Sequence, residues 1–358
     1  MDFLLCNPSV CVVENDYQIL VATKDFGTIA IKVGDEYFYE DNSGVLASQK
    51  NNFKIIVPIS KLDSAKKYSV VYRKVIERKK YFSVVEDIVE KEFAFKPVKE
   101  NDINAYHLAD IHKRFDLAKE AVSYFGKDLD LLIINGDICE VETDGDFFEV
   151  LTFLGEISGG VIPIVFSRGN HDTRGKLAER FTDYFPSVNR NTFYNFNVGP
   201  IGGIVLDCGE DKVESNVVYA DLNRFDSYRR KQKEFLVNHN KTDKKFFFGL
   251  CHIPPCKTTK NIGDEFDIEK DIYTAWCSEL ERIGAKFILS GHLHKTFIVE
   301  KDDESKTCPC NIPLIVGSAL DRANNFMCGT AINFNGDTIT IKFTDNNKQE
   351  LNKYIIKV

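Results

Sequence analysis

The spacing of hydrophobic and polar positions changes at about residue 98. Before this point, short runs rich in β-branched and aromatic residues, at 17–22, 28–33 and 68–73, alternate with turn signals such as Gly34-Asp35. Such residues favour strands, whereas glycine beside aspartate favours tight turns. Since no convincing helical period interrupts these runs, residues 1–98 are expected to form a small all-β sandwich domain.

After residue 98, apolar runs of strand length alternate with amphipathic stretches of helix length. This alternation is typical of a layered α/β domain, which we expect over residues 99–358. Strands are expected at 105–110, 131–136, 162–167, 204–207, 246–252 and 287–291, and near the end of the chain at 312–318, 330–334, 338–343 and 354–358. Helices are expected at 116–125, 146–157, 174–184, 226–238 and 271–282.

Length and charge limit the possible functions. The 358 residues suggest two domains, and 46 basic against 54 acidic residues give a net charge of −8. No basic stripe is visible, so bulk nucleic acid is disfavoured as a partner, whereas a small anionic substrate is compatible. The start of the chain resembles no secretory signal and no apolar run is long enough to span a membrane, so we expect a cytoplasmic protein. The oligomeric state is left open.

The ten cysteines have irregular spacings. In an intracellular protein they are expected to be free thiols, either buried or in loops. Cys308-Pro-Cys310 and the pair Cys251 and Cys256 are the alternative, because they could ligate a structural zinc ion. Neither has the paired spacing that is typical of zinc sites.

Polar residues that can bind metals follow directly on several predicted strands. They occur in five short motifs that contain five of the seven histidines. Ligands of an α/β sheet gather outside the carboxyl ends of its strands, so these side chains are expected to meet at one place. Their mixture of nitrogen and oxygen donors suits two metal ions side by side, the arrangement that splits phosphate esters. The donors are Asp110, His112, Asp137, Asn170, His252, His292 and His294, whereas His171 is expected to face the substrate.

Each motif has a plainer explanation when it is taken alone. Asp137 could be a turn or helix-capping aspartate, and His252 could be a structural histidine with a hydrogen-bond partner. The two histidines outside the series, His107 and His239, are interpreted as structural. Only the five motifs together, each at a strand end, favour the metal centre.

In their order, D-x-H, G-D-x-x-(D/E), G-N-H-D, H and G-H-x-H, the motifs resemble the calcineurin-like metallophosphoesterase superfamily over residues 106–295. The resemblance implies a four-layer α/β/β/α sandwich that uses two divalent or trivalent metal ions, Mn, Fe or Zn. It further implies that a hydroxide bridging the metals attacks phosphorus in line, while His171 protonates the leaving oxygen. The first metal would be held by Asp110, His112 and His294 and the second by Asn170, His252 and His292, with Asp137 bridging the two.

The sequence departs from the family's pattern at Glu140, where relatives carry Asp. In relatives this carboxylate orients the catalytic histidine, so Glu140 is expected to hold His171 through a longer arm. Arg168 resembles an arginine that contacts phosphate in the serine/threonine phosphatase branch, although an ordinary surface arginine fits equally.

Further comparisons narrow the branch of the superfamily that the chain resembles. No tyrosine follows Asp137 and His112 is present, so the site is unlike the iron centre of purple acid phosphatases, although the β-sandwich before the catalytic domain is similar to theirs. The stretches 207–211 and 219–229 look like those of bacterial relatives. The stretch 62–73 resembles part of a fibronectin type III or immunoglobulin-like module.

These patterns predict an enzyme, a metal-dependent hydrolase of phosphate esters, with phosphomonoesters preferred as substrates. The alternatives are a phosphodiesterase acting on cyclic or linear nucleotides and a non-catalytic binding protein of the same fold. The stretch 257–269 after His252 is expected either to line the substrate site or to be an ordinary loop.

Overall fold

The computed structural model describes residues 2–40, 44, 46–256, 269–306 and 308–358. The expected loop at 257–269 lies, except for Glu269, outside the described residues. In the N-terminal part, two predicted strands are one long strand, β2 (Asp16–Val33), which is irregular between Ala22 and Gly27. Its first half pairs with β1 (Ser9–Val13) and β4 (Lys50–Pro58), and its second half pairs with β3 (Glu36–Tyr39) and β5 (Lys67–Glu77).

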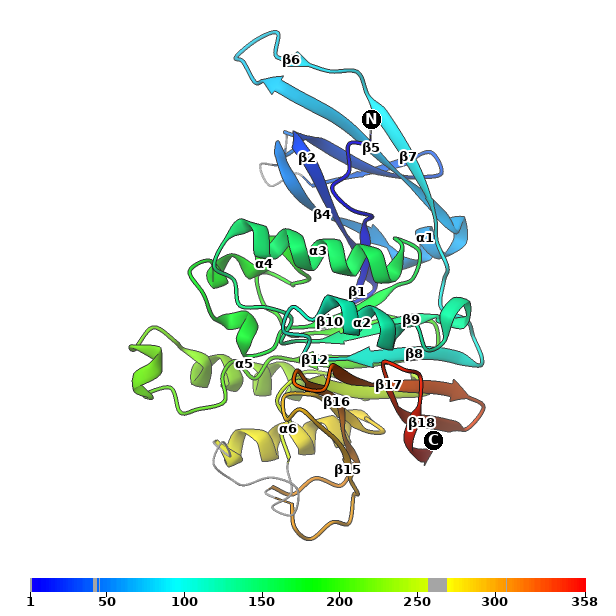
Figure 1. Ribbon diagram of the computed structural model, residues 1–358, viewed down its shortest axis with the longest axis vertical. Helices are drawn as coiled ribbons and strands as arrows, with labels where there is room; N and C mark the ends of the chain where they lie inside the picture. The colour runs from blue at the N-terminus through cyan, green and yellow to red at the C-terminus, as the bar shows by residue number, and fades with distance from the viewer. Residues whose placement is uncertain (1, 41–43, 45, 257–268, 307) are drawn as a thin grey trace.

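The hairpin β5–β7 closes this part, with β7 (Val89–Ala94) along β5 and the short β6 (Val84–Val85) near the tip (Figure 1). The sequence analysis missed one helix here, α1 (Ile59–Ala65). It has only seven residues, and the left-handed backbone of the following residue, Lys66, leads into β5. A helix this short has almost no periodic pattern to detect.

Two sheets form the rest of the molecule. In the first, the parallel strands β10, β9 and β8 are followed by antiparallel β17, β18 and β19. In the second, β11, β12, β13, β14, β16 and β15 are neighbours in that order. The bounds are β8 (Ile103–Leu108), β9 (Leu131–Asn135), β10 (Ile164–Ser167), β11 (Tyr194–Val198), β12 (Ile201–Leu206), β13 (Phe246–Cys251), β14 (Ile288–Ser290), β15 (Lys295–Val299), β16 (Leu314–Asp321), β17 (Phe326–Asn335), β18 (Thr338–Asp345) and β19 (Glu350–Lys357).

Helices cover the outer face of each sheet (Figure 1). Along β9, Ile133 packs in the core between the sheets, whereas Leu132 and Ile134 pack with α2 (Phe115–Val122) and α3 (Asp144–Ser158). On the other side, Trp276 of α6 (Lys270–Ile283) packs on the second sheet beside α5 (Phe225–Val237). The layers are therefore α/β/β/α, which confirms the expected fold.

The predicted helix at 174–184 is largely wrong. Its first residues are irregular, and only a 3₁₀ turn (Ala178–Arg180) and the single-turn α4 (Phe181–Tyr184) remain. Gly175 has a φ of 101°, which no α-helix accommodates. Short 3₁₀ turns also occur at Gly126–Asp128, His171–Thr173 and Val217–Tyr219.

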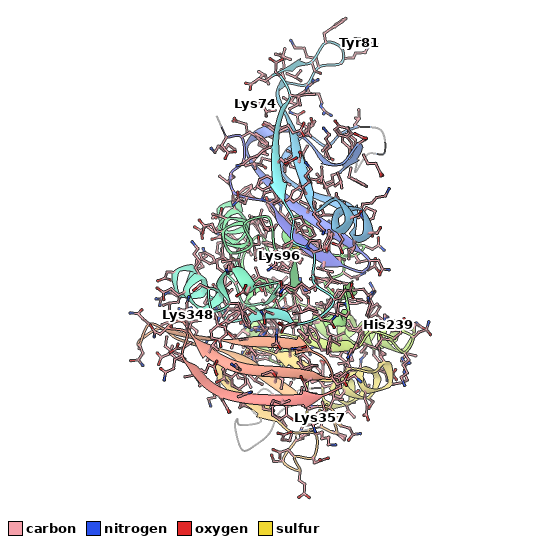
Figure 2. The ribbon with its side chains drawn as sticks, turned by 90° about the vertical axis from the view of Figure 1, so that its right-hand side faces the viewer. Lys74, Tyr81, Lys96, His239, Lys348 and Lys357 are labelled. Atoms are coloured by element: carbon pink, nitrogen blue, oxygen red, sulfur yellow. The ribbon has the colours of Figure 1, made fainter. Side chains whose placement is uncertain are left out.

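Strand pairing and hydrophobic packing, besides the covalent connection, join the N-terminal part to the first sheet. β1 pairs in parallel with β10 through Cys11 and Ile164, and one hydrophobic cluster runs from Tyr17 to Ile133. Lys96, at the passage between the parts, lies 2.9 Å from the buried carboxylate of Asp130 (Figure 2). Among the described residues, no helix is both long and apolar enough to cross a bilayer.

Candidate metal centre

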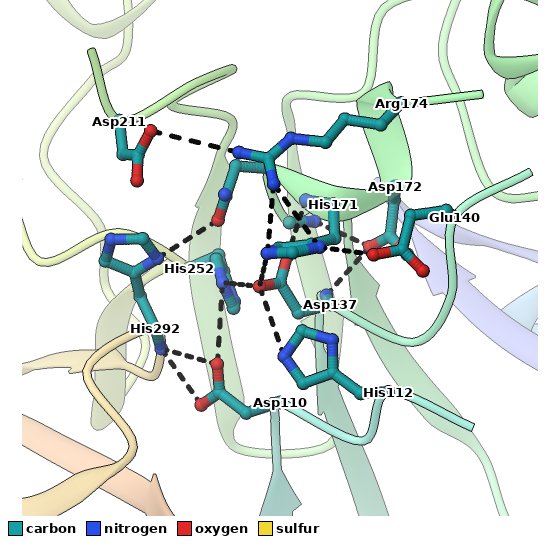
Figure 3. Close-up of polar contacts among 12 residues, drawn as sticks. Asp110, His112, Asp137, Glu140, His171, Asp172, Arg174, Asp211, His252 and His292 are labelled. Atoms are coloured by element: carbon teal, nitrogen blue, oxygen red, sulfur yellow. Dashed lines mark hydrogen bonds and ion pairs between the residues drawn. The ribbon is translucent and has the colours of Figure 1, made fainter. Parts of the chain in front are cut away.

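The predicted metal-binding residues meet at one end of the two sheets, and Figure 3 shows five of them, Asp110, His112, Asp137, His252 and His292. They follow β8, β9, β10, β13 and β14, five strands whose carboxyl ends lie at this edge. Three groups of donors have all their ligating atoms within 4.8 Å of one another. The groups are Asp110, His112 and His294; His112, Asp137 and His171; and Asp137, His252 and His292.

The first group surrounds the end of β8. His112 Nε2 lies 3.3 Å from His294 Nε2, and His294 Nε2 lies 3.8 Å from Asp110 Oδ1. His112 Nε2 is also 3.8 Å from Asp137 Oδ2. Two imidazoles and two carboxylates thus face one small volume, which can accept one cation.

The group of Asp137, His252 and His292 lies on the other side of Asp137, with Asn170 beside it. His252 Nε2 is 3.2 Å from Asp137 Oδ2, and the Asn170 amide oxygen is 3.0 Å from His292 Nδ1. Asp137 Oδ2 therefore lies between the two groups. Its other oxygen is already used, because Oδ1 accepts the backbone N–H of His171 at 2.8 Å.

The donors fit a metal ion for a reason that is visible at His252. Its Nδ1 donates to the backbone oxygen of Asn135 at 2.6 Å, which fixes the ring. Its Nε2 is buried and makes no hydrogen bond of acceptable geometry. A buried polar atom without a partner is costly in a folded protein. A cation at this point would accept the lone pair of Nε2. The hydrogen bond at Nδ1 is the usual support for a metal-binding histidine.

Electrostatics favour a cation at the same place. Burial raises the pKa of Asp110 to about 6 and lowers that of His112 to about 4. Burial would also lower the pKa of His252, but the Asp137 and Asp110 carboxylates outweigh it and raise this pKa to about 10. Without a metal, a proton on His252 therefore compensates the buried carboxylates, and a cation can replace that proton.

The backbone at the donors is strained. Asp110, His112, Asp137, His292 and His294 all have φ between 44° and 71°. This left-handed region costs roughly 1–2 kcal/mol for a residue with a Cβ. Strain of this kind persists only where the surroundings enforce it and gathers at functional sites.

One buried carboxylate enforces part of this geometry. Asp172 accepts four backbone N–H groups, from Asp137 and Gly169 at Oδ2 and from Ile138 and Cys139 at Oδ1, over 2.8–3.2 Å. Burial, with the neighbouring Asp137 carboxylate, raises the pKa of Asp172 to about 6. Asp172 thus ties the turn carrying Asp137 to the turn carrying Asn170.

His171 faces the centre but lies at its open side. Its Nδ1 is 2.6 Å from Glu140 Oε1, so the longer carboxylate of this chain does reach the ring. Its Nε2 lies 4.0 Å from Asp137 Oδ2 and 3.1 Å from Arg174 Nη1. Arg174 is itself held by two parallel bonds of 2.7 Å to the buried Glu210.

Arg168, predicted as a phosphate contact, is paired with a buried carboxylate. Its Nε donates to Asp207 at 2.7 Å, and its guanidinium lies over the ring of Phe181. It lines a cavity of about 400 Å³ together with Phe225 and Tyr228, and the residues lining this cavity include none of the metal donors. The arginine that touches His171 is Arg174, three residues further along the chain.

Sequence reasoning missed four residues that build the centre: Asn135, Asp172, Arg174 and Glu210. Asp172 is the last residue of the G-N-H-D motif, so the sequence did carry a signal for it. Arg174 and Glu210 meet only in the folded chain, and Asn135 acts through its backbone oxygen, which no side-chain pattern reveals.

Strand-end donors around a carboxylate, on a two-sheet α/β/β/α frame, define the class as metal-dependent hydrolases of phosphate esters. The chain belongs to the calcineurin-like phosphoesterase family, whose sequence model matches residues 103–296. No curated protein matches the chain.

Two solved structures share the fold over nearly the whole chain. A purple acid phosphatase from yellow lupin (Lupinus luteus) seeds aligns with a TM-score of 0.64 and 10% identity, covering 98% of this chain and 74% of its own. The structure of PhoD aligns with a TM-score of 0.58 and 10% identity, covering 99% of this chain and 89% of its own. Both alignments include the N-terminal β part, so a β part before the metallophosphoesterase sandwich is shared by all three.

Proposed function

We propose that this protein is a phosphomonoesterase that uses two metal ions, both of which Asp137 would help to hold. The observation that carries the proposal is the position of Asp137 Oδ2, which lies between the two donor groups, 3.8 Å from His112 and 3.2 Å from His252. Asp110, His112 and His294 would hold one ion, and Asn170, His252 and His292 the other. Mn, Fe and Zn all suit this donor set.

When bound, two such ions supply an activated water and neutralise charge on the phosphate oxygens. The residues of the chain provide the rest. Asp137 would hold both ions through Oδ2, while its other oxygen accepts the backbone N–H of His171 and fixes the carboxylate. Asp110 is oriented by the backbone N–H of His292, which lies 3.0 Å from both of its carboxylate oxygens.

We assign proton transfer to the leaving oxygen to His171. Its Nδ1 is held by Glu140, so its Nε2 is directed to the centre, where a leaving group would lie. Glu140 is a positioning residue: it fixes the ring and its tautomer, as a carboxylate does for a catalytic imidazole. The side chain of His171 is 29% exposed, which leaves room for a substrate to approach.

A monoester is favoured over a diester by charge. A terminal phosphate carries up to two negative charges. The Arg174 guanidinium adds a positive charge beside the centre, with its Nη1 3.1 Å from His171 Nε2. Glu210 takes Nε and Nη2 of this guanidinium, so Nη1 is the nitrogen that can donate to a phosphate oxygen. We therefore move the phosphate-contacting role from Arg168 to Arg174.

The test is turnover of p-nitrophenyl phosphate and bis-p-nitrophenyl phosphate by the Mn²⁺-loaded protein. We expect the monoester to be the better substrate by kcat/KM. Asp137→Asn should abolish turnover and weaken metal loading. His171→Ala should lower kcat by a factor of roughly 10²–10⁴ while metal content stays at the wild-type level.

His239→Ala is the matched control, since this histidine lies outside the donor groups, against Phe235 and Phe247. It should leave kcat unchanged. Faster hydrolysis of the diester would overturn the monoester assignment alone. Loss of both metals in His171→Ala would overturn the assigned roles.

A further inference from the structure

Four cysteines outside the metal centre converge in the fold. Cys256 follows β13, Cys277 lies within α6, and Cys308 and Cys310 lie between β15 and β16. All four are at most 5% exposed and belong to one buried cluster. The sequence analysis grouped Cys256 with Cys251, but Cys251 faces Cys208 instead, with the two sulfur atoms 2.8 Å apart.

The four cysteines lie on three chain segments and form two pairs, Cys256 with Cys277 and Cys308 with Cys310, that interact with each other. Cys310 interacts through its thiol with both Cys256 and Cys277, and Cys308 does the same with both. Two reciprocal hydrogen bonds join the segments that carry Cys256 and Cys308. Cys256 Sγ donates to the backbone oxygen of Cys308 at 3.1 Å, and Cys308 Sγ donates to that of Pro255 at 3.1 Å. Each thiol of one pair thus faces both thiols of the other pair.

The segment that carries Cys308 and Cys310 has little regular structure of its own to hold it in place. Between the end of β15 at Val299 and the start of β16 at Leu314, the described residues contain no helix and no strand. Irregular segments of this length inside a compact domain are uncommon unless something holds them. Lys306 adds a local positive charge, since its Nζ donates to the backbone oxygens of Cys310 and Lys301.

We propose that Cys256, Cys277, Cys308 and Cys310 bind one Zn²⁺ ion as a structural tetrathiolate site. Four sulfur donors without an open position are typical of structural zinc, whereas the catalytic centre offers only nitrogen and oxygen. The ion would hold the segment that follows His252, the segment that follows His294 and α6 together. This site is separate from the proposed phosphatase chemistry and does not depend on it.

The full-length protein with Co²⁺ in place of its metals tests the assignment. Cobalt bound by thiolates shows a sulfur-to-metal charge-transfer band in the near ultraviolet, whereas cobalt bound by nitrogen and oxygen does not. We expect this band in the wild type and equally in Asp137→Asn, which removes the bridging ligand of the catalytic centre. The band is read on the protein itself, so no activity is needed.

Two cysteine variants test whether the ion binds at these four residues. Cys277→Ser should lose the band and one equivalent of zinc, measured by elemental analysis, while Cys328→Ser, a buried cysteine of β17 outside the cluster, should keep both. If Cys277→Ser fails to fold, release of one zinc from the wild type on titration with a mercurial reagent gives the same answer. A wild-type protein without the band, or with disulfides among these four cysteines after purification under reducing conditions, would overturn the proposal.

Discussion

Replacing Gly136 by alanine should damage the metal centre without touching a metal ligand. Gly136 directly follows β9 and precedes Asp137, with a φ of 77°. A Cβ built there lies 2.3 Å from the backbone nitrogen of Gly169 and 2.5 Å from its Cα. Both are backbone atoms, so the turn carrying Asp137 or the turn carrying Asn170 must move.

The size of the effect follows from a comparison with Gly34→Ala. Gly34 also has a left-handed backbone, with φ of 60°, but a Cβ there meets no atom within 4 Å. Both substitutions incur the left-handed penalty of roughly 1–2 kcal/mol. Only Gly136→Ala adds overlap, which costs typically about 1–3 kcal/mol in a packed site. We therefore expect a loss of about 1–2 kcal/mol for Gly34→Ala and about 2–5 kcal/mol for Gly136→Ala.

Urea unfolding of the metal-free proteins measures the stability, and titration with Mn²⁺ measures the centre. Disturbing the support of metal ligands lowers metal affinity by roughly 10–100-fold, which we expect for Gly136→Ala. Gly34→Ala should bind Mn²⁺ as the wild type does. If Gly136→Ala keeps wild-type affinity and stoichiometry, the close approach of the two turns does not position the donors, and the reasoning is refuted.

Three further results are expected. Glu140→Gln, which keeps an acceptor for His171 Nδ1, should lower kcat less than Glu140→Ala and leave metal content unchanged; equal loss in both variants would contradict a positioning role. Arg174→Lys keeps the charge but loses the paired bonds to Glu210 that position Nη1. KM for a monoester should therefore rise about tenfold with a smaller change in kcat, and an unchanged KM would remove Arg174 from phosphate binding. Metal binding should release about one proton from His252, whose pKa of about 10 exceeds its unfolded value, so metal affinity should rise with pH up to that pKa. Calorimetry in buffers of different ionisation enthalpy measures the proton, and pH-independent affinity would contradict its role.

The protonated His252 also predicts the stability of the metal-free protein. Because its folded pKa is raised, its contribution is fully present below the unfolded value near 6.5 and is lost as pH rises through about 10. A bound cation takes over this compensation, so the metal-loaded protein should depend less on pH in that range.

The layered fold could be read from the sequence because its strands are nearly uniform apolar runs. Segments such as 131–135 are buried on both faces, and such strands follow one another with helices between them. The donors were predictable for the same reason, since each follows a strand whose end is clear in the sequence. The irregular backbone at the start of 174–184 was not predictable. Gly175 adopts a conformation there that the apolar spacing around it does not reveal.

What the sequence could not show are contacts made between distant segments. Arg174 lies near His171 because Glu210, from beyond β12, holds its guanidinium. The convergence of Cys277 with Cys308 and Cys310 likewise depends on α6 packing beside an irregular segment. Spacing rules evaluate cysteines that are close in the chain, so a site assembled from three segments escapes them.

The arrangement of Asp137 between two donor groups is tested most directly by anomalous diffraction from crystals of the protein grown with Mn²⁺. Two anomalous peaks are expected, one among Asp110, His112 and His294 and one among Asn170, His252 and His292, with an Asp137 oxygen in contact with both. A single peak, or two peaks that do not share Asp137, would contradict the dinuclear centre on which the proposed phosphatase activity depends.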